Sequence, residues 1–347
     1  MGFGVLDLKA VERLLLIQIR PFGDVLLNTP YLPALRQQLP HAEIDFLVRH
    51  PYQSVLRRNP YLDDVVVFRK RRGVMDIIEK LHLMMRVRRC HYDLIVDHIQ
   101  GTTSAQIVAM SGSKYRICFH DARWRRFYNC RVKAARDRYS GDLKFDLLAP
   151  LGIAPPTKGD GAAKHVYPFF YHIEPESRDY IRDWISQQGL ASGQWLLFSP
   201  GSPRARKKWL AGHYAALADM LIEHTQKPVV LLWGPDERAD VQKVADQMAH
   251  RPILAPPTNY NQAAALLTMS SLLVCNDGGL NHLAVAVGTP TLAIFGPTNP
   301  KNWAPEHVAG YNYLKSDGPV AEGDNGFGIR PEEALQKALA LLGTASA

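Results

Sequence analysis

Short apolar runs rich in Leu and β-branched residues alternate along the chain with longer stretches of helical period. Buried parallel strands are continuous apolar runs, and helices between them cover both faces of the sheet. The pattern therefore predicts an α/β protein. The expected strands are 14–19, 44–48, 65–68, 94–97, 115–119, 195–199, 229–233, 272–275 and 291–295. The expected helices are 76–89, 211–223, 237–248, 261–269, 280–287 and 331–342.

The alternation stops between residues 150 and 170, where Pro and Gly gather in the stretch 154–161. A Pro/Gly-rich stretch without periodicity is typical of a linker. We expect two domains, 1–165 and 166–347, and a chain of 347 residues is long enough for two cores. Ligands of open α/β sheets bind at the carboxyl ends of the strands, so functional residues are expected in the loops that follow them.

Basic and acidic residues are distributed unevenly along the chain. The whole sequence has 41 Lys and Arg against 33 Asp and Glu, a net charge of +8, and residues 1–150 hold 25 of the basic and 15 of the acidic side chains. The first domain is therefore expected to bind an anionic partner. Hydrophobic residues make up 46% and charged residues 21% of the sequence, a composition that excludes a disordered or fibrous protein.

Apolar runs such as 14–17 are far shorter than the roughly 20 residues that span a bilayer, so no transmembrane helix is expected. Asp7 and Glu12 interrupt the first 20 residues, which also lack a small-residue cleavage site, so we expect no secretory signal. The four cysteines have no CxxC spacing, and neither a zinc site nor a disulfide framework is expected. These features are typical of a reduced cytoplasmic protein.

The loop after the first expected strand presents Asp24 behind Gly23, which allows a tight turn. Asp24 either caps the helix that follows or acts as a functional carboxylate at the strand end. The loop has no GxGxxG pattern, so it does not favour a nicotinamide or flavin cofactor.

A second loop, 199–209, combines small residues with four cations in five positions. Ser202, Arg206 and Lys207 in this loop are candidates for holding phosphate oxygens, although a solvated basic turn has the same composition. The GxxxxGK[ST] spacing of a P-loop is missing.

A third loop, 275–282, also connects a strand to a helix. Gly278 and Gly279 leave the first N–H groups of the helix open to a pyrophosphate, and Asp277 and His282 lie on either side of them. His282 is either a core residue or a phosphate donor. Thr298 ends a later strand near this position.

The fourth loop places Asp236 and Glu237 after the strand 229–233. One of these carboxylates is expected to accept hydrogen bonds from ribose hydroxyls, and helix capping by Asp236 is the alternative.

Four segments together resemble the ADP-heptose:lipopolysaccharide heptosyltransferases, glycosyltransferase family 9. They are RPFGDVLLNTP at 20–30, RKKW at 206–209, WGPDE at 233–237 and CNDGGLNHLAVAVGTPTLAIFGPTNP at 275–300. The resemblance extends from about residue 14 to 342. The chain departs from the family pattern at Gly278, where Thr or Ser is usual, and its short loop before Asp24 is most similar to heptosyltransferase III.

The resemblance implies a GT-B fold, in which two Rossmann-like domains have parallel sheets facing an interdomain cleft and the last helix, 331–342, packs back on the N-terminal domain. It implies an inverting, metal-independent transfer that needs no cofactor. Asp24 resembles the general base, whereas Lys207, Asp277 and His282 resemble donor-binding residues.

The implied donor is ADP-heptose and the implied acceptor is the inner core of lipopolysaccharide. Arg20, Arg69, Arg72 and Arg123 are candidates for binding this anionic acceptor. We expect a monomer that is peripheral on the cytoplasmic face of the inner membrane of a Gram-negative bacterium.

Two alternatives remain at this point. The first is another nucleotide-sugar enzyme of GT-B fold, either a 2-epimerase or a transferase for a different sugar. The second is a nucleic-acid-binding protein, which the basic run RKRR at 69–72 suggests. The basic residues are not interleaved with aromatic residues in a nucleic-acid-reading motif, so we expect no nucleic acid partner.

Overall fold

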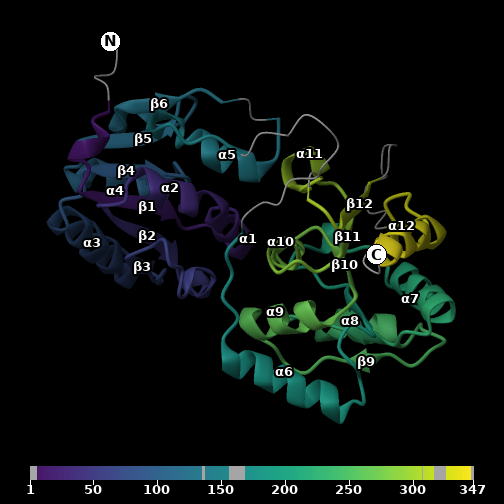
Figure 1. Ribbon diagram of the computed structural model, residues 1–347. Helices are drawn as coiled ribbons and strands as arrows, with labels where there is room; N and C mark the ends of the chain where they lie inside the picture. The colour runs from purple at the N-terminus through teal and green to yellow at the C-terminus, as the bar shows by residue number, and fades with distance from the viewer. Residues whose placement is uncertain (1–5, 135–136, 156–168, 307, 316–325, 345–347) are drawn as a thin grey trace. The chain divides into compact units, whose positions relative to one another are not determined.

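The structure is a computed structural model that describes residues 6–134, 137–155, 169–306, 308–315 and 326–344 (Figure 1). These residues form two compact units, the first comprising 6–155 with 169–172 and the second beginning at residue 173. Most of the expected linker, including the expected boundary at residue 165, lies outside the described residues.

The first unit is built on a parallel sheet of six strands in the order β3-β2-β1-β4-β5-β6. All five strands expected in this half are present, and β6 is an additional strand at the sheet edge. The strands are β1 (Arg13–Gln18), β2 (Glu43–Arg49), β3 (Asp64–Phe68), β4 (Leu94–Asp97), β5 (Tyr115–Phe119) and β6 (Cys130–Val132). Every residue of β4 is buried, as the continuous apolar run predicts.

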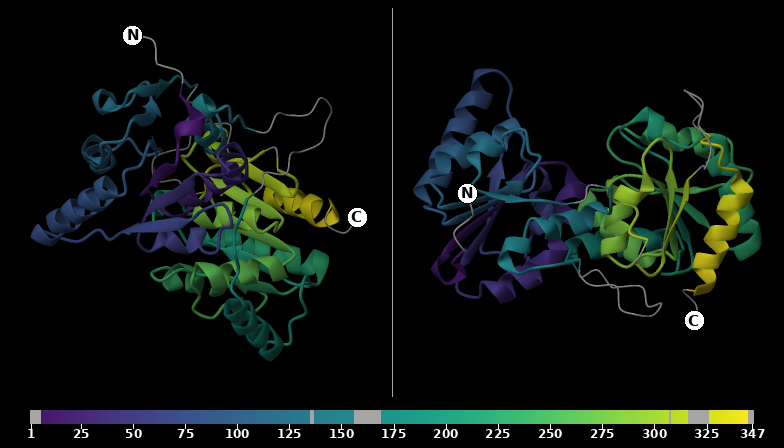
Figure 2. Two further views of the ribbon diagram at one scale, coloured as in Figure 1. Left: turned by 60° about the vertical axis from the view of Figure 1, so that its left-hand side comes forward. Right: turned by 90° about the horizontal axis from the view of Figure 1, so that it is seen from above.

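Helices lie on both faces of this sheet (Figure 2). They are α1 (Phe22–Leu26), α2 (Leu32–Gln38), α3 (Val74–Arg89), α4 (Thr102–Ser111) and α5 (Ser140–Asp146). The apolar residues Ile77, Leu81, Met84 and Met85 of α3 differ in burial. Met84 is buried, whereas the other three are exposed.

The second unit repeats the same architecture. Its strands are β7 (Leu196–Ser199), β8 (Val229–Leu231), β9 (Ile253–Leu254), β10 (Leu272–Asn276), β11 (Thr291–Phe295) and β12 (Tyr311–Lys315). They form a parallel sheet in the order β12-β11-β10-β7-β8-β9. Its helices are α6 (Pro175–Gln187), α7 (Ala211–Thr225), α8 (Arg238–Ala245), α9 (Tyr260–Met269), α10 (Gly279–Ala286), α11 (Pro300–Trp303) and α12 (Pro331–Thr344).

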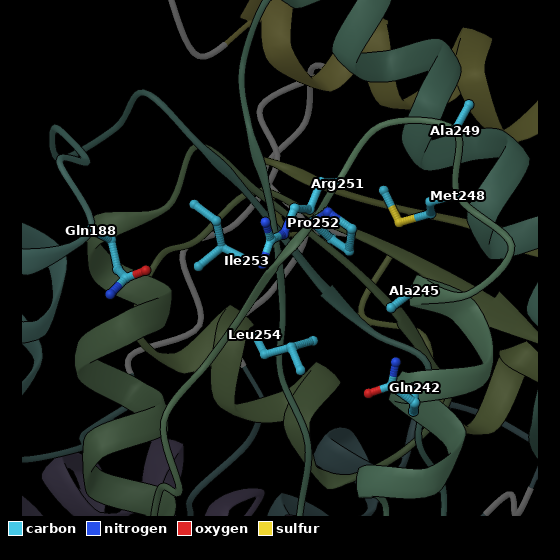
Figure 3. Close-up of a pocket in the computed structure, with 9 residues that line it drawn as sticks. All are labelled: Gln188, Gln242, Ala245, Met248, Ala249, Arg251, Pro252, Ile253 and Leu254. Carbon is cyan, nitrogen blue, oxygen red and sulfur yellow. The ribbon is translucent and has the colours of Figure 1, made fainter.

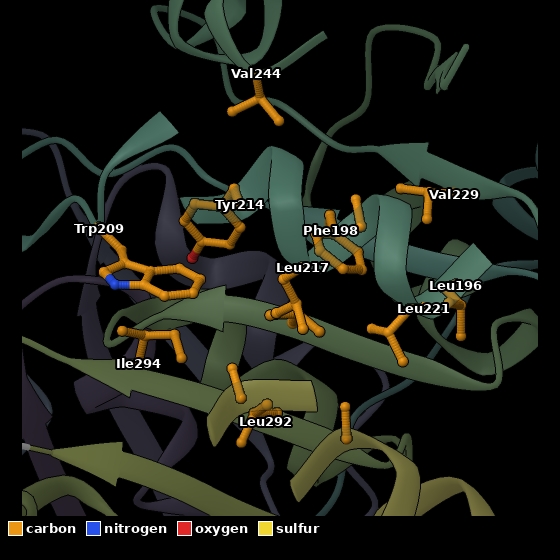
Figure 4. Packing of buried hydrophobic residues seen from close by; sticks show 14 of the residues in the cluster. Leu196, Phe198, Trp209, Tyr214, Leu217, Leu221, Val229, Val244, Leu292 and Ile294 are labelled. Atoms are coloured by element: carbon orange, nitrogen blue, oxygen red, sulfur yellow. The ribbon is translucent and has the colours of Figure 1, made fainter. Parts of the chain in front are cut away.

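Aromatic residues fill the core between α7 and this sheet (Figure 4). The ring of Tyr214 meets Trp209 edge to face, with centroids 5.1 Å apart, and Phe198 in the same manner at 6.2 Å. Such pairs add about 0.5–1.5 kcal/mol each to the free energy of burial. This packing fixes Trp209 and therefore the end of the basic loop that precedes it.

The last helix, α12, joins the same core. Its residues Ala334, Ala338 and Leu341 are buried against α7 and strands β10 to β12 of the second unit. Its apolar face is thus buried within the second unit, and packing of this helix on the N-terminal domain stays a prediction. Small residues at 334 and 338 allow the helix to approach α7 closely.

Both sheets have the strand order of a Rossmann fold, in which the order reverses between the first and fourth strands of the unit. Loops at the carboxyl ends of these two strands form the usual ligand site of such a sheet. The reversal falls between β1 and β4 in the first unit and between β7 and β10 in the second. Among the described residues, none of the helices is both long and apolar enough to cross a membrane.

Candidate active site

Asp24 follows β1 and lies in the first turn of α1, at the point where the strand order of the first unit reverses. Its neighbours Phe22, Val25 and Leu26 are buried and hold this short helix against the sheet. The Asp24 side chain is itself mostly buried, and its Oδ1 lies 3.6 Å from Nζ of Lys144. The structure therefore places a carboxylate and a buried cation together at the carboxyl edge of β1.

Lys144 comes from α5, a helix that the sequence pattern does not predict. The next residue, Phe145, is buried and contacts Tyr31 edge to face, with ring centroids 5.9 Å apart. This contact directs α5 toward α1 and positions the Lys144 side chain beside Asp24. Because 120 residues separate Lys144 from Asp24 and no motif marks it, only the fold reveals the pair.

A chain of hydrogen bonds links the backbone of Asp24 to the loop after β4. Nδ2 of Asn28 donates to the Asp24 carbonyl oxygen at 2.6 Å, and the Tyr31 hydroxyl donates to Oδ1 of Asn28 at 3.1 Å. The same hydroxyl lies 2.9 Å from Nε2 of His98, in the loop after β4. The two loops at the reversal point of the first sheet are thus joined through buried side chains.

His98 is buried, and its ring stacks on Tyr31. Burial, together with the positive charge of Lys144, holds the pKa of His98 well below its ordinary value of 6.5. The ring is therefore neutral near pH 7. Because the Tyr31 hydrogen goes to Asn28, we assign the hydrogen between His98 and Tyr31 to Nε2 of the histidine.

The arginines predicted to bind the acceptor are exposed and do not form the partner of Asp24; that partner is Lys144. Arg20, Arg69 and Arg123 follow β1, β3 and β5, and Arg72 closes the same loop as Arg69. Because carboxyl ends of parallel strands share one edge of the sheet, these loops lie at the edge that carries Asp24.

In the second unit, the loops after β7 and β10 meet through an ion pair. Nζ of Lys207 lies 2.5 Å from Oδ2 of Asp277, and both side chains are largely buried. The neighbouring Lys208 instead pairs with Asp240 at 2.5 Å. Of the two lysines, Lys207 is therefore the one at the reversal point of the sheet.

Asn276, the last residue of β10, joins the same two loops and was missed by the sequence analysis. Its Oδ1 accepts a hydrogen bond from the Trp209 backbone N–H at 3.0 Å. Its Nδ2 donates to the carbonyl oxygens of Pro200 at 2.8 Å and Gly201 at 3.3 Å. The buried amide thereby sets the spacing between the basic loop and the start of α10.

Gly278 caps α10 and Gly279 begins it, as the sequence analysis predicts within one residue. The first N–H groups of a helix have no partner within the helix and attract anions. His282 lies one turn further on, is buried, and has its ring centroid 6.1 Å from that of Trp303. Thr298 is half-buried after the adjacent strand β11.

Glu237 and Asp236 have different surroundings. The Glu237 carboxylate accepts the Gly234 N–H at 2.9 Å, and a Cβ at Gly201 would lie only 2.4 Å from this carboxylate. Asp236 is exposed. Glu237 therefore contacts the loop after β7, and the absence of a side chain at Gly201 makes that approach possible.

Two further predicted residues, Ser202 and Arg206, belong to the loop after β7. Ser202 is buried and its hydroxyl accepts the Arg204 N–H at 3.3 Å, whereas Arg206 is exposed. The loop thus combines a fixed turn with a cation at its surface.

A pocket elsewhere in the second unit has no part in this arrangement (Figure 3). Its lining includes Gln188 at the end of α6, Met248 after α8, Arg251 before β9 and Leu254 in β9. These segments lie at the amino edge of the sheet, opposite the loops described above.

Two Rossmann-type sheets, each with polar side chains at its reversal point, have the architecture of the GT-B class of glycosyltransferases. The model of the family described as glycosyltransferase family 9 (heptosyltransferase) matches residues 80–316. The chain belongs to glycosyltransferase family 9, and the protein is a glycosyltransferase. The family and enzyme class predicted from the sequence are confirmed.

Similar proteins agree with this assignment. Lipopolysaccharide heptosyltransferase 3 of Escherichia coli is 26% identical over 301 residues, which cover 83% of this chain and 84% of that protein. Lipopolysaccharide heptosyltransferase 2 of Escherichia coli K12 is 26% identical over 341 residues, covering 92% and 95%.

Solved structures confirm the GT-B fold. A family 9 glycosyltransferase from Veillonella parvula matches with a TM-score of 0.81 at 24% identity, covering 96% of this chain and 97% of that one. The Escherichia coli ADP-heptose lps heptosyltransferase II matches with a TM-score of 0.73 at 21% identity, covering 96% and 100%.

Proposed function

We propose that the protein transfers heptose from ADP-heptose to the inner core of lipopolysaccharide, with inversion at the anomeric carbon and without a metal ion. Relatives named lipopolysaccharide heptosyltransferases support the reaction class. The observation that carries the proposal is the repeated topology, with Asp24 at the reversal point of one sheet and Lys207–Asp277 at that of the other.

In the proposed reaction, the Asp24 carboxylate removes the proton from an acceptor hydroxyl. The hydroxyl oxygen forms a bond to the anomeric carbon of heptose while the bond from that carbon to the phosphate oxygen breaks. ADP departs with the electron pair. General-base catalysis of this kind contributes about 10² to 10⁴ in rate.

Charge that develops on the departing ADP needs stabilisation. Lys207 and the N–H groups of Gly278 and Gly279 provide a cation and a helix N-terminus at one end of the second sheet. We assign to Lys207 an exchange of partners, from Asp277 to a phosphate oxygen, when the donor binds. Asp277 then keeps the turn in place or contacts the sugar.

The remaining donor contacts follow from the same loops. Glu237 is assigned to the ribose hydroxyls in preference to Asp236, because its carboxylate lies beside Gly201 in the phosphate-side loop. His282, Ser202, Arg206 and Thr298 are assigned to the phosphate side. Gly278 lacks the hydroxyl that its relatives' pattern supplies, so backbone N–H groups carry more of the phosphate binding here.

The acceptor is assigned to the first unit. Its surplus of basic residues and the exposed Arg20, Arg69, Arg72 and Arg123 at the edge that carries Asp24 suit a phosphorylated glycolipid. Such an acceptor lies in a membrane, so we assign the protein to the cytoplasmic face of the inner membrane of a Gram-negative bacterium, as a peripheral monomer.

A donor screen tests this assignment. Thermal unfolding is followed with ADP, UDP, GDP and ADP-heptose, since a ligand stabilises by RT ln(1+[L]/Kd). Larger shifts with ADP and ADP-heptose than with UDP or GDP support the proposal. Equal shifts with all three nucleotides would remove the assignment of the donor.

A further inference from the structure

One helix of the first unit exposes an apolar face. On α3, the exposed fractions are 70% for Val74, 58% for Ile77, 38% for Ile78, 47% for Leu81 and 42% for Met85. We call these five residues the α3 stripe. Met75, at 59%, lies beside it. Single exposed apolar residues are ordinary, whereas a contiguous group on one helix marks an interaction site.

The α3 stripe is separate from the face that holds the helix on the protein. Its members are spaced i, i+3, i+4, i+7 and i+11 from Val74, so they align along one side of a helix with 3.6 residues per turn. The buried residues Leu83 and Val87 lie on the other side of the helix, the buried Met84 lies at the border of the stripe, and α3 packs against α4. Figure 1 shows α3 on the outside of its unit, next to α4. The stripe therefore has no role in the core.

Cations border the α3 stripe. The loop before the helix contains Arg69, Lys70, Arg71 and Arg72, all exposed, and their side chains have no ion-pair partner among the residues that the structure describes. Helical spacing places Arg88 and Arg89 on either side of the stripe near its end. Helical spacing places Asp76 and Glu79 on the opposite side, where their carboxylates accept the backbone N–H groups of Arg71 at 3.0 Å and Arg69 at 3.4 Å.

The basic loop also has a defined place in the sheet. It follows β3, so it lies at the same carboxyl edge as Asp24 in the loop after β1. The first half of α3, residues 74–82, begins at this edge and contains no buried residue. An apolar stripe with a basic loop at its start therefore lies at the edge of the sheet where the acceptor hydroxyl must react.

We propose that the α3 stripe inserts into the interface of a bilayer that contains anionic lipid, with the loop 69–72 on the lipid headgroups. This inference rests on the proposed glycolipid acceptor and adds the element that binds the membrane. Amphipathic helices with apolar residues on one side and Lys or Arg around them bind such interfaces, and each basic residue near an anionic surface adds to the affinity. Docking through α3 brings the edge that carries Asp24 to the headgroup layer.

The test measures sedimentation of the full chain with vesicles of phosphatidylcholine alone or with about one third phosphatidylglycerol. We expect the wild type to bind the anionic vesicles at least about tenfold more tightly than the neutral ones. The double variant Ile77→Ser with Leu81→Ser keeps the charge and should bind anionic vesicles at least about tenfold more weakly than the wild type. The matched control, Tyr180→Ser with Tyr260→Ser, alters two exposed aromatic residues of the second unit and should bind as the wild type does.

A transfer assay separates this inference from the proposed function. With a soluble, delipidated acceptor, the stripe variant should be as active as the wild type, whereas with an acceptor embedded in vesicles its rate should fall with its binding. A wild type that is inactive with the soluble acceptor would contradict the proposed function. Vesicle sedimentation would still test membrane docking, because it does not depend on transfer activity.

Three results would overturn the docking proposal. They are a stripe variant that binds anionic vesicles as tightly as the wild type, a wild type that binds neither vesicle, and sedimentation velocity showing that the stripe instead joins two copies of the chain. Thermal unfolding of the variant checks that it is folded; if it is not, Ile77→Ser alone, at a more exposed position, replaces it in the same assay.

Discussion

Nζ of Lys144 lies 3.6 Å from Oδ1 of Asp24, and both side chains are largely buried at the carboxyl edge of β1. The lysine compensates the negative charge of the carboxylate and fixes its place. A buried carboxylate that lost this partner would be left without a compensating charge, which is costly in a protein interior. Lys144 is therefore assigned as a positioning residue for Asp24.

Lys144→Met should lower kcat by about tenfold or more with little change in the KM for ADP-heptose, because the donor is assigned to the other unit. Lys144→Arg keeps the charge and should recover most of the rate. Steady-state kinetics of the two variants check this expectation. If Lys144→Met and Lys144→Arg lose kcat equally, or if only the donor KM rises, the positioning role is wrong.

Acid should destabilise the protein through His98. Its pKa in the folded protein is well below 6.5, mainly because of burial, so the unfolded chain binds a proton here that the folded chain does not. The contribution of neutral His98 to the free energy of unfolding is fully present above about pH 6.5. It decreases as the pH falls below this value, by up to about 1.4 kcal/mol for each pH unit.

Urea unfolding at pH 7.5 and 5.5 measures the effect of His98. The free energy of unfolding of the wild type should fall by about 1 kcal/mol more than that of His98→Gln, which lacks the titrating ring but can still donate to Tyr31. The same pH dependence in both proteins would show that His98 does not titrate as the burial requires.

Lys207→Ala should weaken ADP binding by about 10- to 150-fold, the range expected for a lost hydrogen bond to a charged group. The adjacent variant Lys208→Ala is a matched control, because Lys208 pairs with Asp240 and not with Asp277. Its ADP affinity should stay within about threefold of the wild type. Isothermal titration calorimetry with ADP compares the two variants. If Lys208→Ala weakens ADP binding more than Lys207→Ala does, the assignment of the phosphate contact to Lys207 is wrong.

Asn276→Ala removes three hydrogen bonds that join the loops after β7 and β10. Because the amide is buried and its partners would be left unsatisfied, the free energy of unfolding should fall by about 2–3 kcal/mol, and ADP affinity should fall as well. Asn312→Ala, on the edge strand β12, should change stability by less than about 1 kcal/mol. Chemical denaturation tests both, and equal small effects would mean that Asn276 does not join the loops in solution.

The central strands of both sheets could be predicted from the sequence because central parallel strands are continuous apolar runs. The edge strand β3 was predicted as well, whereas the edge strands β6, β9 and β12 were not. In β12 (Tyr311–Lys315) the polar residues Asn312 and Lys315 interrupt the apolar run, and β6 has only three residues. Edge strands contact one neighbour and are partly exposed, so they need fewer apolar residues.

The loops that follow strands were predictable, whereas contacts between distant segments were not. Asp24, Lys207 and the Gly278-Gly279 turn lie at strand ends, as their local sequence predicts. Lys144 and His98 are positioned by contacts of α5 and of the loop after β4 with Tyr31, which no local pattern encodes. The α3 helix was predicted, whereas the exposure of its apolar side was not, because the local sequence does not show which side of a helix contacts the sheet.

The most direct test of the account is Asp24→Asn, a change that removes the proton-accepting carboxylate and preserves its size. The measurement is the rate of heptose transfer from ADP-heptose to a soluble inner-core acceptor, with ADP affinity determined by calorimetry on the same sample. We expect the rate to fall by at least about 10² while the ADP affinity stays within about threefold of the wild type. Transfer at the wild-type rate by Asp24→Asn would contradict the assignment of Asp24 as the general base.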